Sequence, residues 1–380
     1  MKILFLDQSG KLGGAELSLL DLAKFYRDSC LVCLFADGSF KEALERNQVP
    51  VSVLSKRSLK IHKNSNLGQS IKSIGQLLPL INQVTQISRE YDIIYANTQK
   101  AMVVGAMVSF LTKKPLIYHL HDILSPEHFS LANRQLAVSL ANRFTSLIIA
   151  NSKATKTAFI KAGGKKQLVE VVYNGFNLEQ YQNLKPEATQ LRQKLSLTRK
   201  HVVGHFSRLS PWKGQHILLE ALTDCPDVTA VFVGDALFGE HEYVEQLHQQ
   251  VKQLGLGDRV LFLGFRTDIP QLMSMCDLIV HTSIAPEPFG RVIVEAMLCG
   301  KPIVATAGGG TSELISHGYT GWLTPSGDIS KLGEIINRCR QQPDLTRAIA
   351  QAGKDAAVRR FDLSKIERQI DYLLCKVINF

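Results

Sequence analysis

Two glutamates eight residues apart carry the clearest chemical signal in the sequence. Glu287 stands between Pro286 and Pro288, which hold the chain extended, and Glu295 lies in the stretch 291–298, whose apolar spacing predicts a helix. Helical side chains lean toward the N-terminus, so Glu295 is expected to project back about 7.5 Å along the axis, toward the turn. We therefore expect both carboxylates to line one pocket.

The start of this predicted helix also favours an anion. Its first N–H groups have no partner within the helix, and its dipole is positive at this end, which suits a nucleotide diphosphate. Two carboxylates that accept hydroxyl groups beside an anion site indicate an activated sugar. The alternative is an ordinary helix, with one acid stabilising its dipole and the other on its surface.

Two cations follow the strand predicted at 201–206. Arg208 and Lys213 are five residues apart, with Pro211 and Gly214 shaping the turn, and they could hold a diphosphate from one side. Exposed, solvated side chains are the alternative.

The first half of the chain offers a glycine turn and a histidine cluster. Gly13 and Gly14 lie between the strand predicted at 2–7 and a helix, where glycine lets a phosphate approach the backbone or serves packing alone. His121 and Asp122 follow the strand predicted at 115–119, and ligands bind at such carboxyl ends. A metal site or a structural histidine is the alternative. His119 is expected to face the opposite way and is less favoured.

These motifs resemble the signature of family-4 retaining glycosyltransferases, the glycosyl transferases group 1, strongly over 201–325 and more loosely over 1–180. The resemblance rests on Glu-Pro-Phe-Gly at 287–290 followed by Glu-Ala-Met at 295–297. It implies the GT-B fold, an α/β class with two Rossmann-like, doubly wound parallel-sheet domains facing across a cleft.

The resemblance also implies roles for individual residues. Glu287 would contact hydroxyls of the donor sugar, Glu295 the ribose, and His121 the sugar near the reacting carbon. The leaving phosphates would be held by Arg208, Lys213 and the backbone amides at Phe289 and Gly290. Further donor contacts would come from Gly13 and Gly14 at the diphosphate and from Phe265 and Arg266 along the base, with Glu313 structural.

A chain of 380 residues is too long for one ordinary core, which predicts two domains. The strand–helix alternation predicts an N-terminal domain at 1–180 and a C-terminal domain at 198–362. The resemblance implies that the first binds the acceptor and the second the nucleotide sugar. Lys/Gln/Glu-rich sequence would link them near 180–198. The helix at 363–380 is expected to pack back on the N-terminal domain.

The net charge of +10 is unevenly placed: residues 1–185 hold 23 Lys and Arg against 13 Asp and Glu, and the remainder holds 21 of each. A basic first half favours an anionic partner, namely a membrane surface or a phosphorylated acceptor, over nucleic acid. Lys56, Arg57, Lys60 and Lys63 add to this basic surface. Seven scattered cysteines favour reduced thiols, as in a cytosol. Asp7 ends the first apolar run too early for the core of a signal peptide. We therefore expect a cytoplasmic protein, which would lie on the inner face of the membrane if it binds there.

The sequence thus predicts a retaining glycosyltransferase that moves a sugar from a nucleotide-diphosphate sugar to a saccharide or lipid-linked acceptor in polysaccharide or glycolipid synthesis. UDP, GDP and ADP donors stay open. No Asp-x-Asp pair follows a strand, so neither a metal nor another cofactor is expected. The alternatives are a sugar-nucleotide epimerase or hydrolase and a non-catalytic binding module. A dinucleotide-dependent oxidoreductase is disfavoured, because no Gly-x-Gly-x-x-Gly turn follows the first strand.

Overall fold

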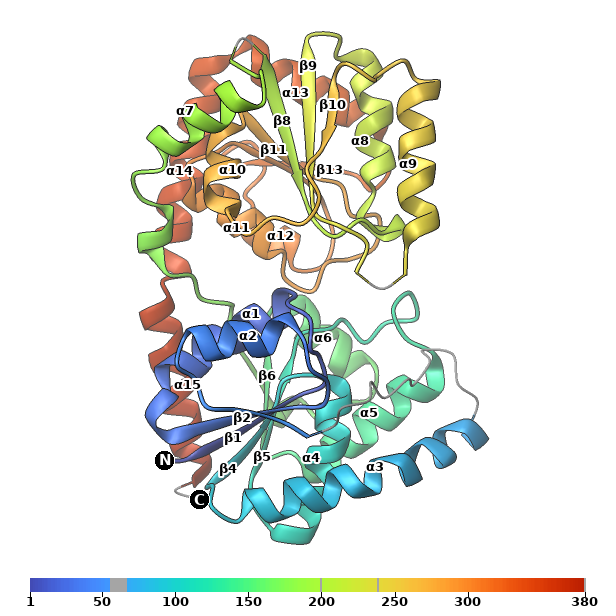
Figure 1. Ribbon diagram of the computed structural model, residues 1–380, viewed down its shortest axis with the longest axis vertical. Helices are drawn as coiled ribbons and strands as arrows, with labels where there is room; N and C mark the ends of the chain where they lie inside the picture. The colour runs from blue at the N-terminus through green and yellow to red at the C-terminus, as the bar shows by residue number, and fades with distance from the viewer. Residues whose placement is uncertain (55–66, 199, 238, 379–380) are drawn as a thin grey trace. The chain divides into compact units, whose positions relative to one another are not determined.

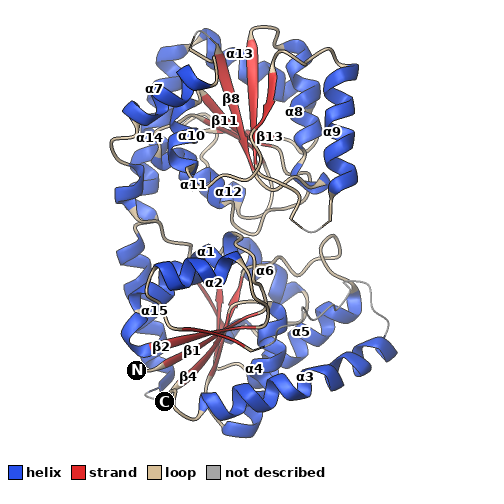
Figure 2. Ribbon diagram, viewed as in Figure 1, coloured by secondary structure: helices blue, strands red, loops and turns tan. Residues whose placement is uncertain are grey.

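The computed structural model describes residues 1–54, 67–198, 200–237 and 239–378. The chain forms two compact units: unit 1 comprises Met1–Gly175 and Leu363–Phe380, and unit 2 comprises Phe176–Asp362. In each unit helices cover both faces of one sheet (Figure 1, Figure 2). The predicted α/β class with two Rossmann-like domains is confirmed.

Unit 1 is built on seven parallel strands in the order β3-β2-β1-β4-β5-β6-β7. The order reverses between β1 and β4, which creates the switch point where doubly wound sheets bind ligands. The strands are β1 (Ile3–Asp7), β2 (Cys30–Leu34), β3 (Val51–Val53), β4 (Ile93–Ala96), β5 (Leu116–Leu120), β6 (Leu147–Ala150) and β7 (Val169–Val171).

The helices of unit 1 connect these strands and bury their apolar sides against them. The run 101–111 lies in α4, where Met102, Val104 and Val108 are fully buried. Within the described residues, no helix is both long enough and apolar enough to span a bilayer. The helices are α1 (Gly14–Phe25), α2 (Ser39–Arg46), α3 (Leu67–Ser88), α4 (Gln99–Thr112), α5 (Leu131–Phe144), α6 (Lys153–Lys161) and α15 (Leu363–Ile378), with short 3-10 turns η1 (Arg27–Ser29) and η2 (Lys166–Leu168).

Helix α15 completes the core of unit 1. Its residues Ile366, Ile370 and Leu374 recur every four positions and are buried in the apolar cluster on one face of the sheet. The hydroxyl of Tyr26, just after α1, donates to Asp371 Oδ1 at 2.7 Å. The last helix therefore lies beside α1 (Figure 1).

Unit 2 is built on six parallel strands in the order β10-β9-β8-β11-β12-β13, with its switch point between β8 and β11. The strands are β8 (His201–Phe206), β9 (Val228–Val233), β10 (Val260–Phe262), β11 (Leu278–His281), β12 (Ile303–Thr306) and β13 (Trp322–Thr324). The helices are α7 (Lys185–Lys194), α8 (Gln215–Ala221), α9 (His241–Gln253), α10 (Ile269–Met275), α11 (Arg291–Leu298), α12 (Thr311–Leu314), α13 (Ile329–Gln341) and α14 (Pro343–Arg360), with 3-10 turns η3 (Leu178–Tyr181), η4 (Pro211–Lys213) and η5 (Leu222–Asp224).

The structure differs from the predicted boundary at 180 and the linker at 180–198. The chain leaves unit 1 after Gly175, and α7 packs against α10 within unit 2. Ala188 is buried there, and Arg192 Nη2 lies 2.6 Å from Asp277 Oδ2. Since most of α7 is solvated, its composition resembles a linker although it is a surface helix.

Candidate active site

A buried ion pair between two predicted site residues lies at the carboxyl end of the unit 2 sheet. Glu287 is 6% exposed, and its Oε1 accepts a hydrogen bond from Lys213 Nζ. The same oxygen accepts from His281 Nε2 at 3.0 Å and from Ser283 Oγ at 2.6 Å. The other oxygen of the carboxylate, Oε2, takes part in none of these three bonds.

The donors around Glu287 keep it ionised. Burial by itself would raise the pKa of this carboxyl, but the Lys213 charge and the hydrogen bonds from His281 and Lys213 outweigh burial and lower the pKa well below its ordinary value. Glu287 is therefore a carboxylate, able only to accept hydrogen bonds, at any physiological pH.

The turn that carries Lys213 is fixed to the end of β11. Gly214 has a φ of +68°, and a Cβ there would come within 2.1 Å of the Thr282 carbonyl oxygen, so only glycine fits. Thr282 Oγ1 donates to the Gly214 carbonyl at 2.7 Å, and the Ile284 N–H donates to the Trp212 carbonyl at 2.8 Å. These bonds place Lys213 against Glu287.

Both predicted cations flank one aromatic ring. Lys213 Nζ lies 4.0 Å and the Arg208 guanidinium carbon 5.6 Å from the centroid of the Trp212 ring, within the range of cation–π attraction. Arg208 Nη1 also lies 4.0 Å from Glu240 Oε1. The structure thus brings Arg208 and Lys213 together, which their sequence spacing predicted.

The glycine run 308–310 supports the backbone of Glu287. The Gly310 N–H donates to the Glu287 carbonyl at 2.7 Å, and a Cβ on Gly309, whose φ is +59°, would meet the same oxygen at 2.1 Å. Glu313 belongs to the following helix, α12, and its carbonyl accepts from Arg360 at 2.9 Å. The run therefore pins the extended segment that carries Glu287.

A pocket opens beside Glu287, between the ends of β11 and β12. Glu295 is not among the residues that line this pocket, and its Oε1 lies 3.8 Å from Arg291 Nε, one turn earlier on α11. The two side chains form an (i, i+4) ion pair on one side of this helix. The lining residues are Ser283, Ile284, Ala285, Pro286, Glu287, Thr306, Ala307, Gly308, Thr311 and Ser326.

The remaining predicted donor contacts have different surroundings. Phe289 is 3% exposed, with its ring 6.5 Å from that of Phe176, so only its backbone is left for a ligand. Gly290 precedes α11 with a φ of +98°. Phe265 is 54% exposed, whereas Arg266 donates to Asp268 at 2.8 and 2.5 Å.

In unit 1, three polar residues meet at the ends of neighbouring strands. Asn97 Nδ2 donates to Asp7 Oδ2 at 2.7 Å, and His121 Nε2 lies 2.9 Å from Asn97 Oδ1. The predicted glycines lie nearby in the chain: Gly13 is the N-cap of α1 and Gly14 its first residue.

Two buried acids, Asp7 in this cluster and Glu16 on α1, have raised pKa values. Burial raises the pKa of Asp7 to about 6, against the opposing effect of its hydrogen bonds. Burial, followed by the charge of Asp7, raises the pKa of Glu16 to about 8. Glu16 is accordingly protonated at neutral pH.

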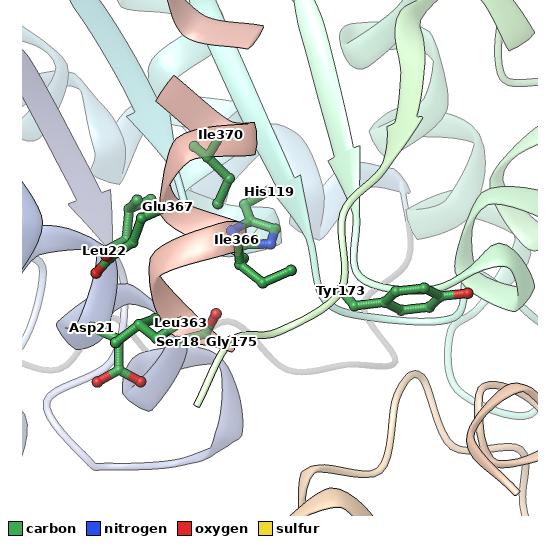
Figure 3. A pocket seen from close by; sticks show the side chains of 10 residues that line it. All are labelled: Ser18, Asp21, Leu22, His119, Tyr173, Gly175, Leu363, Ile366, Glu367 and Ile370. Atoms are coloured by element: carbon green, nitrogen blue, oxygen red, sulfur yellow. The ribbon is translucent and has the colours of Figure 1, made fainter. Parts of the chain in front are cut away.

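The expectation that His119 faces away from His121 is wrong. Residues two apart on a strand share a face, and the two ring centroids lie 3.9 Å apart. His119 is buried, its Nδ1 lies 2.8 Å from the Tyr95 hydroxyl, and burial lowers its pKa to about 3. Figure 3 shows it among the residues lining a pocket beneath α15.

Sequence reasoning missed five residues of these two clusters: Asp7, Asn97, Trp212, His281 and Ser283. Asp7 and Asn97 stand at strand ends, so the rule that selected His121 applies equally to them. Within the described residues, no three His, Cys, Asp or Glu side chains gather as metal ligands would.

Comparison with known proteins places the chain among glycosyltransferases. The family "Glycosyl transferases group 1" matches residues 187–356, and "Glycosyltransferase Family 4" matches residues 12–180. The crystal structure of Anabaena HepE in complex with UDP-glucose is 57% identical, with a TM-score of 0.93 over 99% of this chain and 100% of that one.

Curated relatives match over shorter stretches. Spore coat protein SA of Bacillus subtilis is 39% identical over 173 residues, 40% of this chain and 44% of that protein. N-acetyl-alpha-D-glucosaminyl L-malate synthase of Bacillus anthracis is 29% identical over 211 residues, 55% of this chain and 54% of that protein. The chain thus spans about half the length of these relatives. Together with the two parallel-sheet units, the matches show that it belongs to glycosyltransferase family 4 and has the GT-B fold.

Proposed function

We propose that this glycosyltransferase moves a hexose from a uridine-diphosphate sugar to the hydroxyl of a saccharide or lipid-linked acceptor, with retention of the anomeric configuration. The observation that carries the proposal is the Glu287–Lys213 pair, with Arg208 on the same ring as Lys213. The choice of donor is supported by HepE, whose structure was solved with UDP-glucose.

In this proposal Lys213 and Arg208 stabilise the charge that develops on the leaving diphosphate, as the backbone amides at Phe289 and Gly290 do. Glu287, ionised and with three donors on Oε1, accepts hydrogen bonds from the sugar hydroxyls through Oε2. Glu295 binds the nucleotide ribose, and His121 binds the sugar. Protein groups then take the part that a metal ion plays elsewhere, so the reaction needs none.

The anomeric configuration is retained because the acceptor attacks the same face of the sugar from which the leaving group departs. The bond between the anomeric carbon and the phosphate oxygen breaks while the acceptor oxygen bonds to that carbon on the same face. The acceptor proton passes to the departing phosphate oxygen, which gives UDP and the glycoside.

A donor screen tests the proposal. UDP-, GDP- and ADP-sugars are each incubated with and without saccharide or glycolipid acceptors, nucleotide release is measured, and proton NMR assigns the product anomer. We expect acceptor-dependent release from a UDP-sugar and an unchanged configuration, and loss of release in Arg208→Ala. Release without acceptor would indicate a hydrolase or epimerase, and binding without turnover a binding module.

We also propose that unit 1 docks on an anionic membrane surface, where it would meet an acceptor of the cell envelope. The charge excess of residues 1–185 supports this. So does the end of α4, where Phe110 and Leu111 are 53% and 58% exposed just before Lys113 and Lys114. Apolar side chains beside cations suit a membrane interface, and each cation contributes about 1 kcal/mol at an anionic leaflet.

Sedimentation with vesicles tests this docking. We expect recovery with anionic but not neutral vesicles, falling as salt rises. Phe110→Ser with Leu111→Ser, and reversal of Lys56, Arg57, Lys60 and Lys63, which lie outside the described residues, should each reduce it. Equal recovery with both vesicle types would refute the docking.

A further inference from the structure

The cluster in unit 1 spans three adjacent strand ends. Asp7 is the last residue of β1, Asn97 follows β4 and His121 follows β5, and these strands are neighbours in the sheet. Their carboxyl ends lie at the switch point, where this class of sheet binds ligands. The order of the contacts is Asp7 to Asn97 to His121.

Two acceptors fix which way the Asn97 amide points. Its Nδ2 donates to Asp7 Oδ2 at 2.7 Å and to the Ala15 carbonyl oxygen at 3.2 Å. A backbone carbonyl can only accept, so the amide nitrogen must face it whether or not Asp7 carries a proton. The amide oxygen is thereby turned toward His121.

The orientation of Asn97 determines where His121 carries its proton. His121 Nε2 lies 2.9 Å from Asn97 Oδ1, an atom that can only accept, so Nε2 must be the donor. A neutral imidazole with its proton on Nε2 carries no proton on Nδ1, so Nδ1 can accept a hydrogen bond but cannot donate one.

The surroundings hold both ends of this arrangement rigid. Asp7 is fully buried, and its Oδ1 accepts from the Ser9 N–H at 2.8 Å. The ring of His119, buried and neutral, lies against the ring of His121, with 37° between their planes. Rigid neighbours of this kind keep a functional imidazole in one orientation.

We propose that Asp7 and Asn97 are positioning residues that hold His121 with its proton on Nε2, so that Nδ1 accepts a hydrogen bond from a substrate hydroxyl. The identity of that hydroxyl, on the donor sugar or the acceptor, rests on the proposed function. The position of the proton depends on the fold of unit 1 alone. His121 then acts on the substrate as an acceptor, not as a proton donor.

Long-range proton–nitrogen NMR on ligand-free protein labelled with ¹⁵N-histidine reads the protonated nitrogen directly. The experiment is run near pH 8, and His121→Gln assigns the signal. We expect the Nε2–H pattern in the natural protein and a mixture of both tautomers in Asn97→Leu, which removes the acceptor at similar size. Tyr95→Phe removes the partner of His119 and leaves the Asp7–Asn97–His121 contacts in place, so it should leave the His121 signal unchanged.

Kinetics provide the second measurement. Loss of the group that orients a metal-ligating histidine typically costs about 10–100-fold in activity, and we take the same order of magnitude for His121. We expect this loss in kcat of Asn97→Leu. UDP affinity should change much less than kcat, because the proposed nucleotide contacts are in unit 2, apart from those expected of Gly13 and Gly14.

An Nδ1–H pattern in the natural protein, or equal spectra for it and Asn97→Leu, would overturn the proposal even if transfer is observed. The expected NMR result without any transfer would count only against the proposed function. If Asn97→Leu does not fold, the spectrum of the natural protein still decides.

Discussion

Replacing Lys213 by methionine should destabilise unit 2 through the charge left on Glu287. Methionine keeps an unbranched stem of similar length against Trp212 but removes the cation. Breaking a buried ion pair by removing one partner costs about 3–5 kcal/mol, because the other charge stays in a low dielectric. His281 and Ser283 still donate to the carboxylate, so we expect about 3 kcal/mol.

Urea unfolding followed by tryptophan fluorescence measures the loss in the free energy of unfolding of unit 2, because both tryptophans, Trp212 and Trp322, belong to that unit. With a slope of about 1–3 kcal/mol per M urea, the loss lowers the midpoint by about 1–3 M. Arg208→Met is the matched control. Its ion pair with Glu240 is long, at 4.0 Å, and its side chain is 25% exposed, so the loss should stay below about 1 kcal/mol.

The double variant Lys213→Met with Glu287→Gln completes the test. Without the carboxylate, most of the penalty should disappear, giving a coupling energy of more than about 1 kcal/mol. Equal midpoints for Lys213→Met and Arg208→Met, together with no recovery in the double variant, would refute the view that a buried charge pair holds this turn.

Three further outcomes are expected. Glu295→Gln should weaken calorimetric binding of the free nucleotide diphosphate by roughly 1–3 kcal/mol, whereas Glu287→Gln should spare that binding and impair transfer; the reverse order would contradict the two assigned roles. Transfer should survive EDTA, and loss restored by magnesium or manganese would show that a metal is required. Burial raises the pKa of Glu16 from 4.5 to about 8, so between pH 4.5 and about 8 the folded state binds more protons than the unfolded state. The contribution of Glu16 to the stability of unit 1 therefore falls as the pH rises through this range. Hydrogen exchange of β1 and β4 should show this slope, and a slope unchanged in Glu16→Gln would exclude Glu16 as its source.

The sheets could be predicted because parallel strands covered by helices on both faces are near-continuous apolar runs, such as Ile3–Leu6 and Leu278–Val280. Contacts at the site could not be predicted in the same way. Lys213 and Glu287 are 74 residues apart, and they meet because β8 and β11 are neighbours at the switch point.

The unit 1 cluster was missed for a related reason. A lone aspartate at the end of a first strand is an ordinary surface residue until the strand order brings Asn97 and His121 beside it. The 8-residue spacing of the two glutamates, by contrast, predicted the direction of Glu295 but not its contact with Arg291. The helix period sets which way a side chain points, not which residue it contacts.

The return of α15 to unit 1 has a consequence for synthesis on the ribosome. The apolar cluster that contains Phe5 and Tyr26 is closed only when Ile366, Ile370 and Leu374 arrive, after the whole of unit 2. At bacterial or eukaryotic elongation rates, roughly 200 residues separate these events by roughly 10–40 s. During that interval the nascent unit 1 exposes an apolar face, so chaperone binding to this face should end once the last helix emerges.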